Sequence, residues 1–400
     1  MKIFYLSLTA VVVLTAHSAM AQNTSLEMKY EKEGIYIGKS ITKVPDNIPS
    51  AKAVAVGDKT KVGESAVAVG YEADAHLEGA TAVGRRTKTQ AYAVAMGFQA
   101  NAGVQAVSIG KDSKGTGNFA VAVGDEAKAS GKLSSAIGRS AKATGNRSNA
   151  LGFNSLASGE FSIAFGDDSQ GTAKYSTALG NQAKALGEKS TAVGAFSKAS
   201  GEGSLSFGSG VHTTGNNSFS MGRNIKNNGT KTVAIGNNID VTTDNSVFLG
   251  DGSRYTDQSE TSGGIGKVDG NYAGADAKGV VSVGNKGNER RIQNVAAGLL
   301  SHQSTDAVNG SQLHTTNQRL EEVNKDAKAG IAAAMAFKDV PFVPGKWSYA
   351  AGAAHYSSES AVSLNLGRTS ANGKYSISGG ISSDSRGRVG FRVGISGVFN

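Results

Sequence analysis

Lysine is the chemically active side chain that recurs most regularly along this 400-residue chain. It stands four places after a periodic glycine in eight copies of a short repeat, at Lys61, Lys88, Lys114, Lys128, Lys142, Lys184, Lys198 and Lys226. If the repeats stack as β-structure about 4.8 Å apart, adjacent lysines form a ladder of ammonium groups. Such a ladder could hold an acidic ligand, and the candidate binding residues are Lys128, Lys142, Lys184 and Lys198. The alternative is a solvated face that keeps the molecule soluble and discourages lateral aggregation.

Side chains suited to catalysis or metal binding do not cluster in the sequence. The six histidines are scattered, at His17, His76, His212, His302, His314 and His355. The carboxylates Asp125, Asp167 and Asp168 lie singly in expected turns, whereas acid–base catalysis needs such groups to converge on one site. There is no cysteine, so neither disulfides nor thiolate metal sites are expected. We therefore predict no enzyme activity and no catalytic, cofactor-binding or metal site.

The periodic glycine determines which elements carry these side chains. It recurs at Gly57, Gly70, Gly84, Gly97, Gly110, Gly124, Gly138, Gly152, Gly166, Gly180, Gly194, Gly208, Gly222, Gly236 and Gly250, in steps of 13 or 14 residues. A short fixed period is typical of a solenoid, and 14 residues suit two short strands and two turns. The period differs from the six residues of a hexapeptide acyltransferase. No Gly-Lys-Ser/Thr ending is present for a phosphate-binding loop.

Two side-chain columns alternate before each glycine. A large apolar residue comes immediately before it, as at Ile137 and Leu179, and the positions two and four residues before it are small, mostly Ala, Ser or Thr. Alternation places the two sets on opposite faces of a strand. We expect the large residues to fill the core of each coil. The small residues would then let the solenoid pack against copies of itself, or else face water.

The N-terminus resembles a secretory signal of residues 1–21. Lys2 supplies a charge, residues 4–14 are largely apolar, and Ala19-Met20-Ala21 fits a cleavage site between Ala21 and Gln22. Removing this segment lowers the formal net charge from +9 to +8. A positive surplus permits acidic partners without identifying one, and we expect no nucleic-acid partner.

The last 55 residues contain four runs with period-two alternation. In the final run Val389, Phe391 and Val393 share one face, while Gly390 and Arg392 share the other. Strands of this kind are typical of an outer-membrane barrel. Four strands cannot close a barrel, and open edges are not tolerated in lipid, so three chains would supply twelve strands. The strand number by itself therefore predicts a homotrimer.

A short coiled coil is expected ahead of these strands. Leu313, Leu320, Ala327 and Ala334 are spaced by seven residues. The companion seam fits two registers, one through Thr316 and Val323 and the other through Asn317, Asn324 and Ile331. The segment then becomes rich in alanine and glycine, which suits a helix inside a confined space.

Several strings resemble trimeric autotransporter adhesins of the YadA type. Ser190-Thr191-Ala192-Val193-Gly194 resembles their head repeat, and residues 288–298 and 305–313 resemble their neck. Residues 330–336, 344–346 and 359–362 resemble their membrane anchor. The resemblance implies a mainly β chain: a left-handed parallel β-roll head, a trimeric coiled-coil stalk and a 12-stranded outer-membrane barrel. The chain ends on Asn400 after Phe399, whereas the family usually ends on an aromatic residue, which predicts less efficient barrel insertion.

The predicted domains follow from these features. They are the signal peptide (1–21), an N-terminal lead-in (22–52), head repeats (53–250), a neck (251–312), the stalk and pore helix (313–340) and the anchor (341–400).

The resemblance implies a bacterial surface adhesin, exported and anchored by its own barrel, that binds host extracellular matrix or cells and promotes self-association. Its expected partners are two further copies of the chain, host matrix proteins or acidic glycans, the outer-membrane assembly machinery and outer-membrane lipid. A surface spacer or protective coat protein without a specific ligand remains the alternative.

Overall fold

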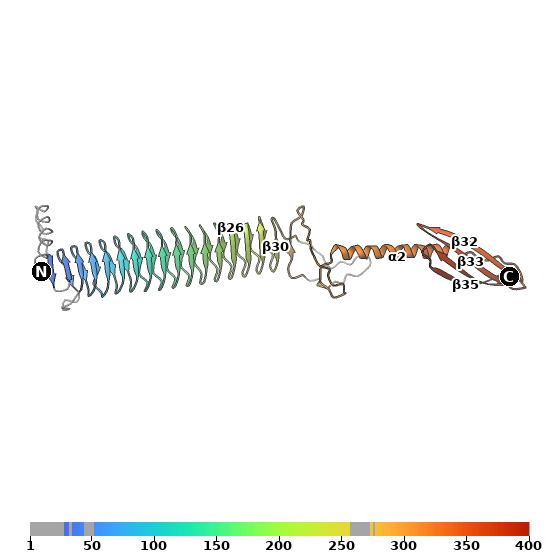
Figure 1. Cartoon of the computed structure of the whole chain (residues 1–400), viewed down its shortest axis with the longest axis horizontal. Coiled ribbons are helices and arrows are strands. Elements are labelled where there is room, and N and C mark those ends of the chain that lie inside the picture. Colours follow the sequence, from blue (N-terminus) through green and yellow to red (C-terminus); the bar gives the residue numbers. More distant parts are fainter. Residues whose placement is uncertain (1–27, 32–33, 44–51, 257–272, 275–276, 400) are drawn as a thin grey trace, which may run out of the picture. The chain divides into compact units, whose positions relative to one another are not determined.

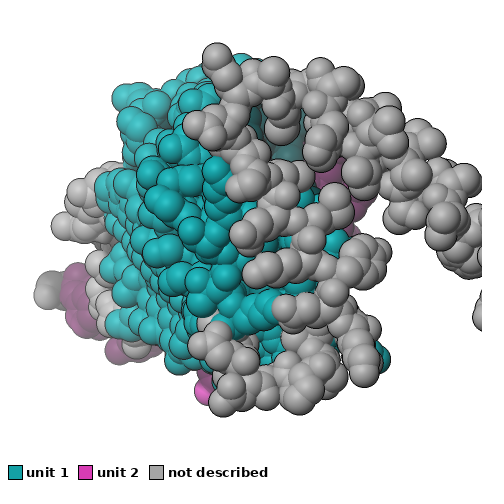
Figure 2. Space-filling model, turned by 90° about the vertical axis from the view of Figure 1, so that its left-hand side faces the viewer, with its two compact units in different colours: residues 1–261, 276–291 teal, residues 262–275, 292–400 magenta. Residues whose placement is uncertain are grey.

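The computed structural model describes residues 28–31, 34–43, 52–256, 273–274 and 277–399. The predicted signal peptide and its cleavage site between Ala21 and Gln22 lie outside these residues. The chain divides into two compact units, residues 1–261 with 276–291 and residues 262–275 with 292–400 (Figure 2).

Unit 1 is a parallel β-solenoid in which successive coils stack in chain order (Figure 1). One strand series ends at the periodic glycines: β4 (Val54–Val56), β6 (Val67–Val69), β8 (Thr81–Val83), β10 (Val94–Met96), β12 (Val107–Ile109), β14 (Val121–Val123), β16 (Ser135–Ile137), β18 (Asn149–Leu151), β20 (Ile163–Phe165), β22 (Thr177–Leu179), β24 (Thr191–Val193), β28 (Val233–Asn237) and β30 (Val247–Leu249). The period predicted this architecture correctly.

The second series follows each glycine by four residues: β5 (Lys61–Val62), β7 (Asp74–Ala75), β9 (Lys88–Thr89), β11 (Asn101–Ala102), β13 (Lys114–Gly115), β15 (Lys128–Ala129), β17 (Lys142–Ala143), β19 (Leu156–Ala157), β21 (Gln170–Gly171), β23 (Lys184–Ala185), β25 (Lys198–Ala199) and β29 (Asp240–Val241). In two coils both series merge into one long strand, β26 (Leu205–Thr213) and β27 (Phe219–Asn227).

Both ends of the solenoid carry additional strands. The first coil, β2 (Gly34–Ile37) and β3 (Thr42–Lys43), lies within the predicted lead-in and pairs in parallel with β4 and β5. Strand β1 (Met28–Glu31) pairs antiparallel with β2. At the other end β31 (Val281–Ser282) pairs with β30, after the excursion that begins at Gly250. Such pairings protect the open ends of a stacked sheet from other chains.

The core of each coil is made of small side chains, contrary to the prediction from sequence. Ala136, two residues before Gly138, is fully buried, and so are Ala141 and Ala143 of the facing strand. The large residues expected inside are instead on the outer surface, with Ile137 41% and Leu179 39% exposed in the single chain. The two strand series of a coil face each other at close range, so in the central coils the space between them is filled by small residues such as Ala, Ser and Thr. Alternation defined two faces correctly, but the inner and outer faces were assigned the wrong way round.

Many buried serine hydroxyls in this core donate to the turn beside them, whereas Ser190 Oγ has no partner among the described residues. Ser134 Oγ donates to the carbonyl oxygen of Gly131, and Ser148 Oγ donates to that of Gly145, each at 2.7 Å. Toward the end of the solenoid the core changes to larger residues, including Val211, Ile225 and the fully buried Phe248. A polar group inside a thin coil is therefore tolerated because its hydrogen bond is made locally.

Unit 2 contains helix α2 (Gly310–Ala336) and a four-stranded antiparallel sheet, β32 (Trp347–Tyr356), β33 (Glu359–Thr369), β34 (Tyr375–Asp384) and β35 (Val389–Gly397). The predicted strands are thus confirmed. The helix begins at a capping box in which the Asn309 side chain accepts from Gln312 N. No helix in the described part of the chain is long and apolar enough to span a membrane.

The sheet and the C-terminal half of α2 pack together through small residues. Ala332, Ala333 and Ala336 of the helix form a buried cluster with Ala361 of β33. Ser363 Oγ donates to the carbonyl oxygen of Ala336 at 2.6 Å. The small, polar face of the sheet therefore covers the helix, and the opposite face carries exposed apolar side chains.

Candidate ligand-binding surface of the head

The predicted lysine ladder is present in the register of the second strand series. Lys114 pairs with Lys128, Lys128 with Lys142, and Lys184 with Lys198. Leu156 and Gln170 occupy the two rungs between the groups, as the sequence indicated. The side chains on either side of each lysine in sequence are buried, so the lysine is the outward residue of its strand. The structure thus brings the four candidate residues together as two adjacent pairs.

Most of this column has no ion-pair partner. Lys61, at the N-terminal end, lies 3.8 Å from Asp74 on the next rung. Within the described residues, no carboxylate lies within 4 Å of the ammonium group of a column lysine from Lys114 to Lys226. Like charges directly opposite each other across a sheet are destabilising. Retaining lysine on three consecutive rungs therefore has a free-energy cost that an anionic ligand would offset.

Charges on the neighbouring corner alternate in sign instead. Glu72 lies 3.9 Å from Lys59 Nζ and 2.9 Å from Arg86 Nε, so three successive coils form a plus–minus–plus ladder. The hydrogen bond from Arg86 lowers the pKa of the Glu72 carboxyl. A hydrogen bond with the Tyr71 hydroxyl raises the pKa of Lys59. Oppositely charged side chains on adjacent coils therefore pair with each other at this corner, unlike the lysines of the column from Lys114 to Lys226.

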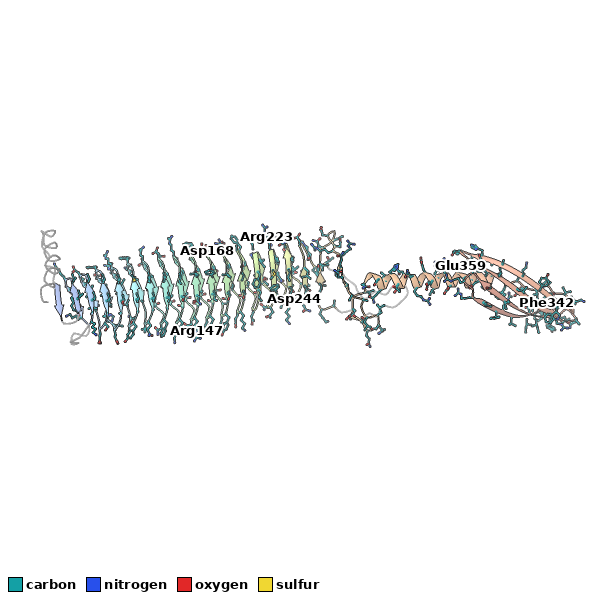
Figure 3. All side chains as sticks on the ribbon, in the orientation of Figure 1. Arg147, Asp168, Arg223, Asp244, Phe342 and Glu359 are labelled. Carbon is teal, nitrogen blue, oxygen red and sulfur yellow. The ribbon has the colours of Figure 1, made fainter. Side chains whose placement is uncertain are left out.

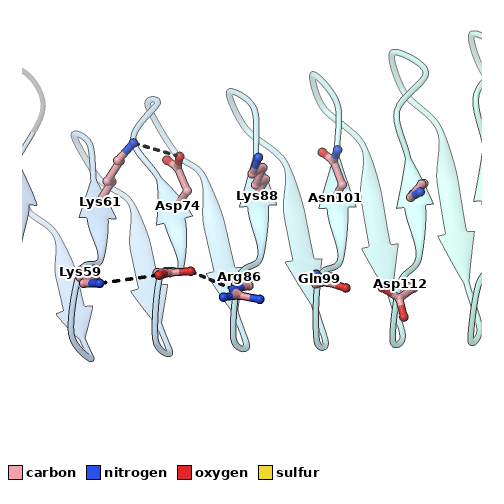
Figure 4. Close-up of a pocket in the computed structure, with 10 residues that line it drawn as sticks. Lys59, Lys61, Asp74, Arg86, Lys88, Gln99, Asn101 and Asp112 are labelled. Carbon is pink, nitrogen blue, oxygen red and sulfur yellow. Dashed lines mark hydrogen bonds and ion pairs between the residues drawn. The ribbon is translucent and has the colours of Figure 1, made fainter.

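The two columns border a shallow groove over the first coils (Figure 4). It has a volume of about 700 Å³, and one of its rows runs from Lys61 to Lys114 while the other runs from Lys59 to Asp112. Because both signs of charge occur here, this part of the head is less suited to a purely anionic ligand than the coils that follow.

The outward large residues form a second continuous surface, on the other series of strands. Ile109, Ile137, Leu151, Phe165 and Leu179 are all exposed in the single chain. Apolar stripes of this extent are rare on monomeric soluble proteins and mark interfaces. The alternation that sequence analysis detected is therefore informative about assembly rather than about the interior of the coil.

Large residues at the second corner, most of them aromatic, were missed in the sequence. Five residues before a periodic glycine stand Tyr92, Phe119, Leu133, Phe161 and Tyr175, each exposed or half-buried and each at a φ of +56° to +60°. Phe161 and Tyr175 stack with ring centroids 5.2 Å apart. Arg147 lies over Phe161, and Figure 3 places Arg147 on the edge opposite Asp168. Their common offset from the glycine could have identified them.

The carboxylates considered for catalysis are structural. Asp167 accepts a hydrogen bond from Phe153 N at 3.0 Å, and Asp168 accepts one from Asn154 Nδ2 at 2.7 Å. Asp125 lies 4.0 Å from Arg139. Among the described residues no group of His, Cys, Asp and Glu is arranged to hold a metal ion. These carboxylates connect consecutive coils at their corners.

Comparison with known proteins finds three family models that match this chain. The YadA head domain repeat matches residues 62–87, 103–127, 129–155, 150–169, 172–197 and 199–224. The coiled stalk of trimeric autotransporter adhesin matches residues 291–334, and the YadA-like membrane anchor domain matches residues 341–399. These models together match more than half of the chain.

Individual relatives match over shorter stretches. The trimeric autotransporter adhesin AtaA of Acinetobacter sp. (strain Tol 5) is 52% identical over 85 residues, which are 21% of this chain and 2% of that protein. The autotransporter adhesin BtaE of Brucella suis biovar 1 (strain 1330) is 60% identical over 52 residues, 13% of this chain and 7% of that protein. The chain thus spans less than a tenth of the length of these relatives.

Among solved structures, the C-terminal YadA-like domain of BPSL2063 from Burkholderia pseudomallei is 37% identical, with a TM-score of 0.26, over 32% of this chain and 58% of that one. The match of residues 341–399 to the YadA-like membrane anchor domain indicates a surface-exposed protein anchored in the outer membrane of Gram-negative bacteria. The adhesin family is non-enzymatic. The chain belongs to the trimeric autotransporter adhesins, with YadA head repeats, a coiled stalk and a YadA-like membrane anchor.

Proposed function

We propose that three copies of this chain assemble into an adhesin that binds host extracellular matrix or cells and promotes self-association between bacteria. The main support for a trimer is the anchor sheet, because its edge strands β32 and β35 have no further partner within the sheet. Its outward face is apolar, with Phe391 79% and Val393 81% exposed. Three such sheets give twelve strands, which would satisfy every edge within the lipid.

In the head, the outward column through Ile137 and Leu179 would form the contact between the three solenoids. Because about two-fifths of each side chain is exposed in the single chain, burying the remainder contributes on the order of 1 kcal/mol per residue, and the contact repeats along the stacked coils. The small residues that we expected to meet a neighbouring copy are already used inside the coil. The apolar stripe therefore replaces them as the proposed assembly surface.

Export would use the same C-terminal anchor. After removal of the signal peptide in the periplasm, the outer-membrane assembly machinery would insert the twelve strands into outer-membrane lipid. The head would then pass through the barrel, and α2 would remain inside it. The small residues between α2 and the sheet support this arrangement, because they allow helices to fit within a narrow barrel.

Adhesion would rest on repetition of weak contacts. Three heads on one stalk, with many copies per cell, increase avidity without a tight single site. We propose that Lys128, Lys142, Lys184 and Lys198 contact acidic partners, because these four side chains point outward and form no ion pair within the described residues. A spacer or coat protein that binds no ligand is the competing function.

The test is adherence of bacteria that display the full-length chain. Cells of a non-adherent strain expressing it are applied to immobilised collagen, fibronectin and laminin and to cultured host cells. The control strain displays the same chain without residues 53–250, at equal surface density. Head-dependent adherence to any of these surfaces would support an adhesin. Equal adherence of both strains to all of them would favour the spacer.

A further inference from the structure

A second column runs beside the lysines on the same face of the head. In the coils from Gly110 to Gly208 it consists of hydroxyl side chains six places after the periodic glycine, with Leu186 as the exception there: Thr116, Ser130, Thr144, Ser158, Thr172, Ser200 and Thr214. Positions four and six share one face of an extended chain, because the residue between them points inward. In the central coils that intervening residue is Ala129 or Ala143, both fully buried.

The hydroxyl column is held in the same register as the lysines. Beyond the second strand of each coil, Ser130 N donates to Ala143 O at 3.0 Å, and Thr144 N donates to Ala157 O at 2.9 Å. Ser158 N donates to Gly171 O at 3.0 Å. The backbone ladder therefore continues through these residues, and their side chains repeat at the spacing of the coils, about 4.8 Å.

Near the C-terminal end of the column, Thr214 Oγ1 donates to Asn228 Oδ1 at 2.6 Å and Ser200 Oγ is buried. In the central coils the outer hydroxyls of Ser130, Thr144 and Ser158 differ both from these two and from the serines inside the coil. The inner Ser134 and Ser148 donate to turn carbonyls. In the described part of the chain, no side-chain hydrogen bond is made by the hydroxyls of Ser130, Thr144 and Ser158. Their donors and acceptors are available to a ligand on the surface.

We propose that the two columns together form a track for an extended anionic polysaccharide that lies parallel to the solenoid axis. The ammonium groups would bind its carboxylates or sulfates, and the Ser and Thr hydroxyls would hydrogen-bond to its sugar hydroxyls. From Lys114 to Lys226 the track covers eight rung spacings, or about 38 Å. This inference rests on the proposed adhesin function and specifies the ligand of its lysine surface.

The two columns compensate for each other's gaps. Where the lysines are interrupted at Leu156 and Gln170, the hydroxyls of Ser158 and Thr172 continue the track. The third interruption, between Lys198 and Lys226, is His212, which is itself polar. Where the hydroxyls are interrupted at Leu186, Lys184 is present in the same coil. A chain of sugar residues would therefore meet a polar group at every rung.

An acidic peptide fits this surface less well. An extended peptide gains most of its affinity by pairing its backbone with a free sheet edge. Here the backbone groups of the second strand series already pair with the coils on both sides. The face offers mainly side-chain hydroxyls and ammonium groups, which match the hydroxyl and acid groups of a charged glycan.

The experiment uses the full-length protein, purified in detergent, and measures its affinity for heparin, chondroitin sulfate, neutral dextran and polyglutamate. The lysine variant combines Lys128→Gln, Lys142→Gln, Lys184→Gln and Lys198→Gln. The hydroxyl variant combines Ser130→Ala, Thr144→Ala and Ser158→Ala. The matched control changes four corner lysines outside the column to Gln: Lys132, Lys174, Lys189 and Lys231. Circular dichroism and light scattering check that each variant keeps its fold and assembly.

The wild-type protein should bind heparin or chondroitin sulfate, not dextran, and more weakly as salt rises. The lysine variant should lose about tenfold in affinity and much of the salt dependence. The hydroxyl variant should lose about three- to tenfold with its salt dependence unchanged. The corner control should change less than about twofold.

Absence of binding to both glycans, or an equal loss in the corner control, would overturn the track. Equal binding of heparin and polyglutamate, with no effect of the hydroxyl variant, would replace it with an acidic-peptide surface. If neither glycan binds while displayed heads still adhere to matrix proteins, only this inference is wrong. If the head adheres to nothing, the proposed adhesin function fails as well.

Discussion

Ala136 and Ile137 are adjacent in sequence and lie on opposite sides of the same three-residue strand, one fully buried and the other 41% exposed. The inner side accepts only small residues because a second strand of the same coil lies directly opposite. The outer side has no such neighbour within the chain. This relation repeats along the head, and it separates what holds a coil together from what is available for assembly.

Substitutions at these two residues should therefore fail in different ways. Ala136→Leu inserts volume into a closed interior and should lower the free energy of unfolding of the head by about 1–3 kcal/mol or more. Ile137→Asp should leave the coil folded and instead place a charge in the proposed subunit contact, at a cost of several kcal/mol. Thermal unfolding by circular dichroism and trimer content by light scattering distinguish them. A large loss of coil structure in Ile137→Asp with the trimer retained would contradict the assigned faces.

Gly180 should be irreplaceable at its corner. Its φ is +132°, and a Cβ built there would lie 2.7 Å from the carbonyl oxygen of Gly194 on the next coil. Gly180→Ala should therefore disturb two coils and increase proteolysis at this corner, whereas Asn181→Ala, on an exposed neighbouring position, should not. Limited proteolysis of the full-length protein would measure both. Equal cleavage of the two variants would argue against close backbone packing between coils.

The anchor sheet should be more sensitive to charge on its apolar face than to loss of charge on its other face. Val393→Arg should cost about 2–4 kcal/mol near the middle of the membrane and reduce surface display. Arg392→Ser removes an ion pair with Asp339 at 2.9 Å, but the Asp339 side chain is 86% exposed, so its loss should matter little. Antibody labelling of intact cells compares the two variants. Equal display would show that the faces of β35 are misassigned.

Asp326 connects α2 to the turn between β34 and β35. Its Oδ1 lies 2.6 Å from Arg386 Nε and 3.4 Å from Arg388 Nη2. Asp326→Asn should weaken this connection by about 1 kcal/mol and lower the temperature at which the detergent-resistant trimer dissociates. Glu321→Gln, an exposed carboxylate on the same helix, is the control. A similar shift for both variants would attribute the effect to helix charge alone.

Acid should weaken the first coils through Glu72. Its pKa is lowered in the folded state, chiefly by the hydrogen bond from Arg86, so its stabilising contribution is present above the ordinary value of 4.5 and is lost as the pH falls through the lower folded value. Between pH 5 and pH 3, roughly, the wild-type melting temperature should therefore fall more than that of Glu72→Gln. Glu202→Gln, which removes an exposed carboxylate that forms no ion pair in the described structure, should follow the wild type. Parallel curves for wild type and Glu72→Gln would refute the linkage.

The sequence by itself determined the solenoid, the four anchor strands and the register of the lysine column. These depend on local periodicity: a glycine every 13 or 14 residues defines one corner, and alternation within short strands defines two faces. The position of Lys128 beside Lys142 follows directly from that period, because stacking places equivalent residues on adjacent rungs.

Only the tertiary structure decided which face of each strand is the inside. Their size suggested that Ile137 and Leu179 form the core. The two strand series of these coils lie so close together, however, that the space between them is filled by small residues such as Ala, Ser and Thr. Which face of each strand is outside also decides which hydroxyls beside the lysines are free. Inner serines donate to nearby turn carbonyls, whereas the outer hydroxyl of Thr144 forms no hydrogen bond within the described residues. The residue type alone does not reveal this difference, because it depends on the side of the strand that the residue occupies.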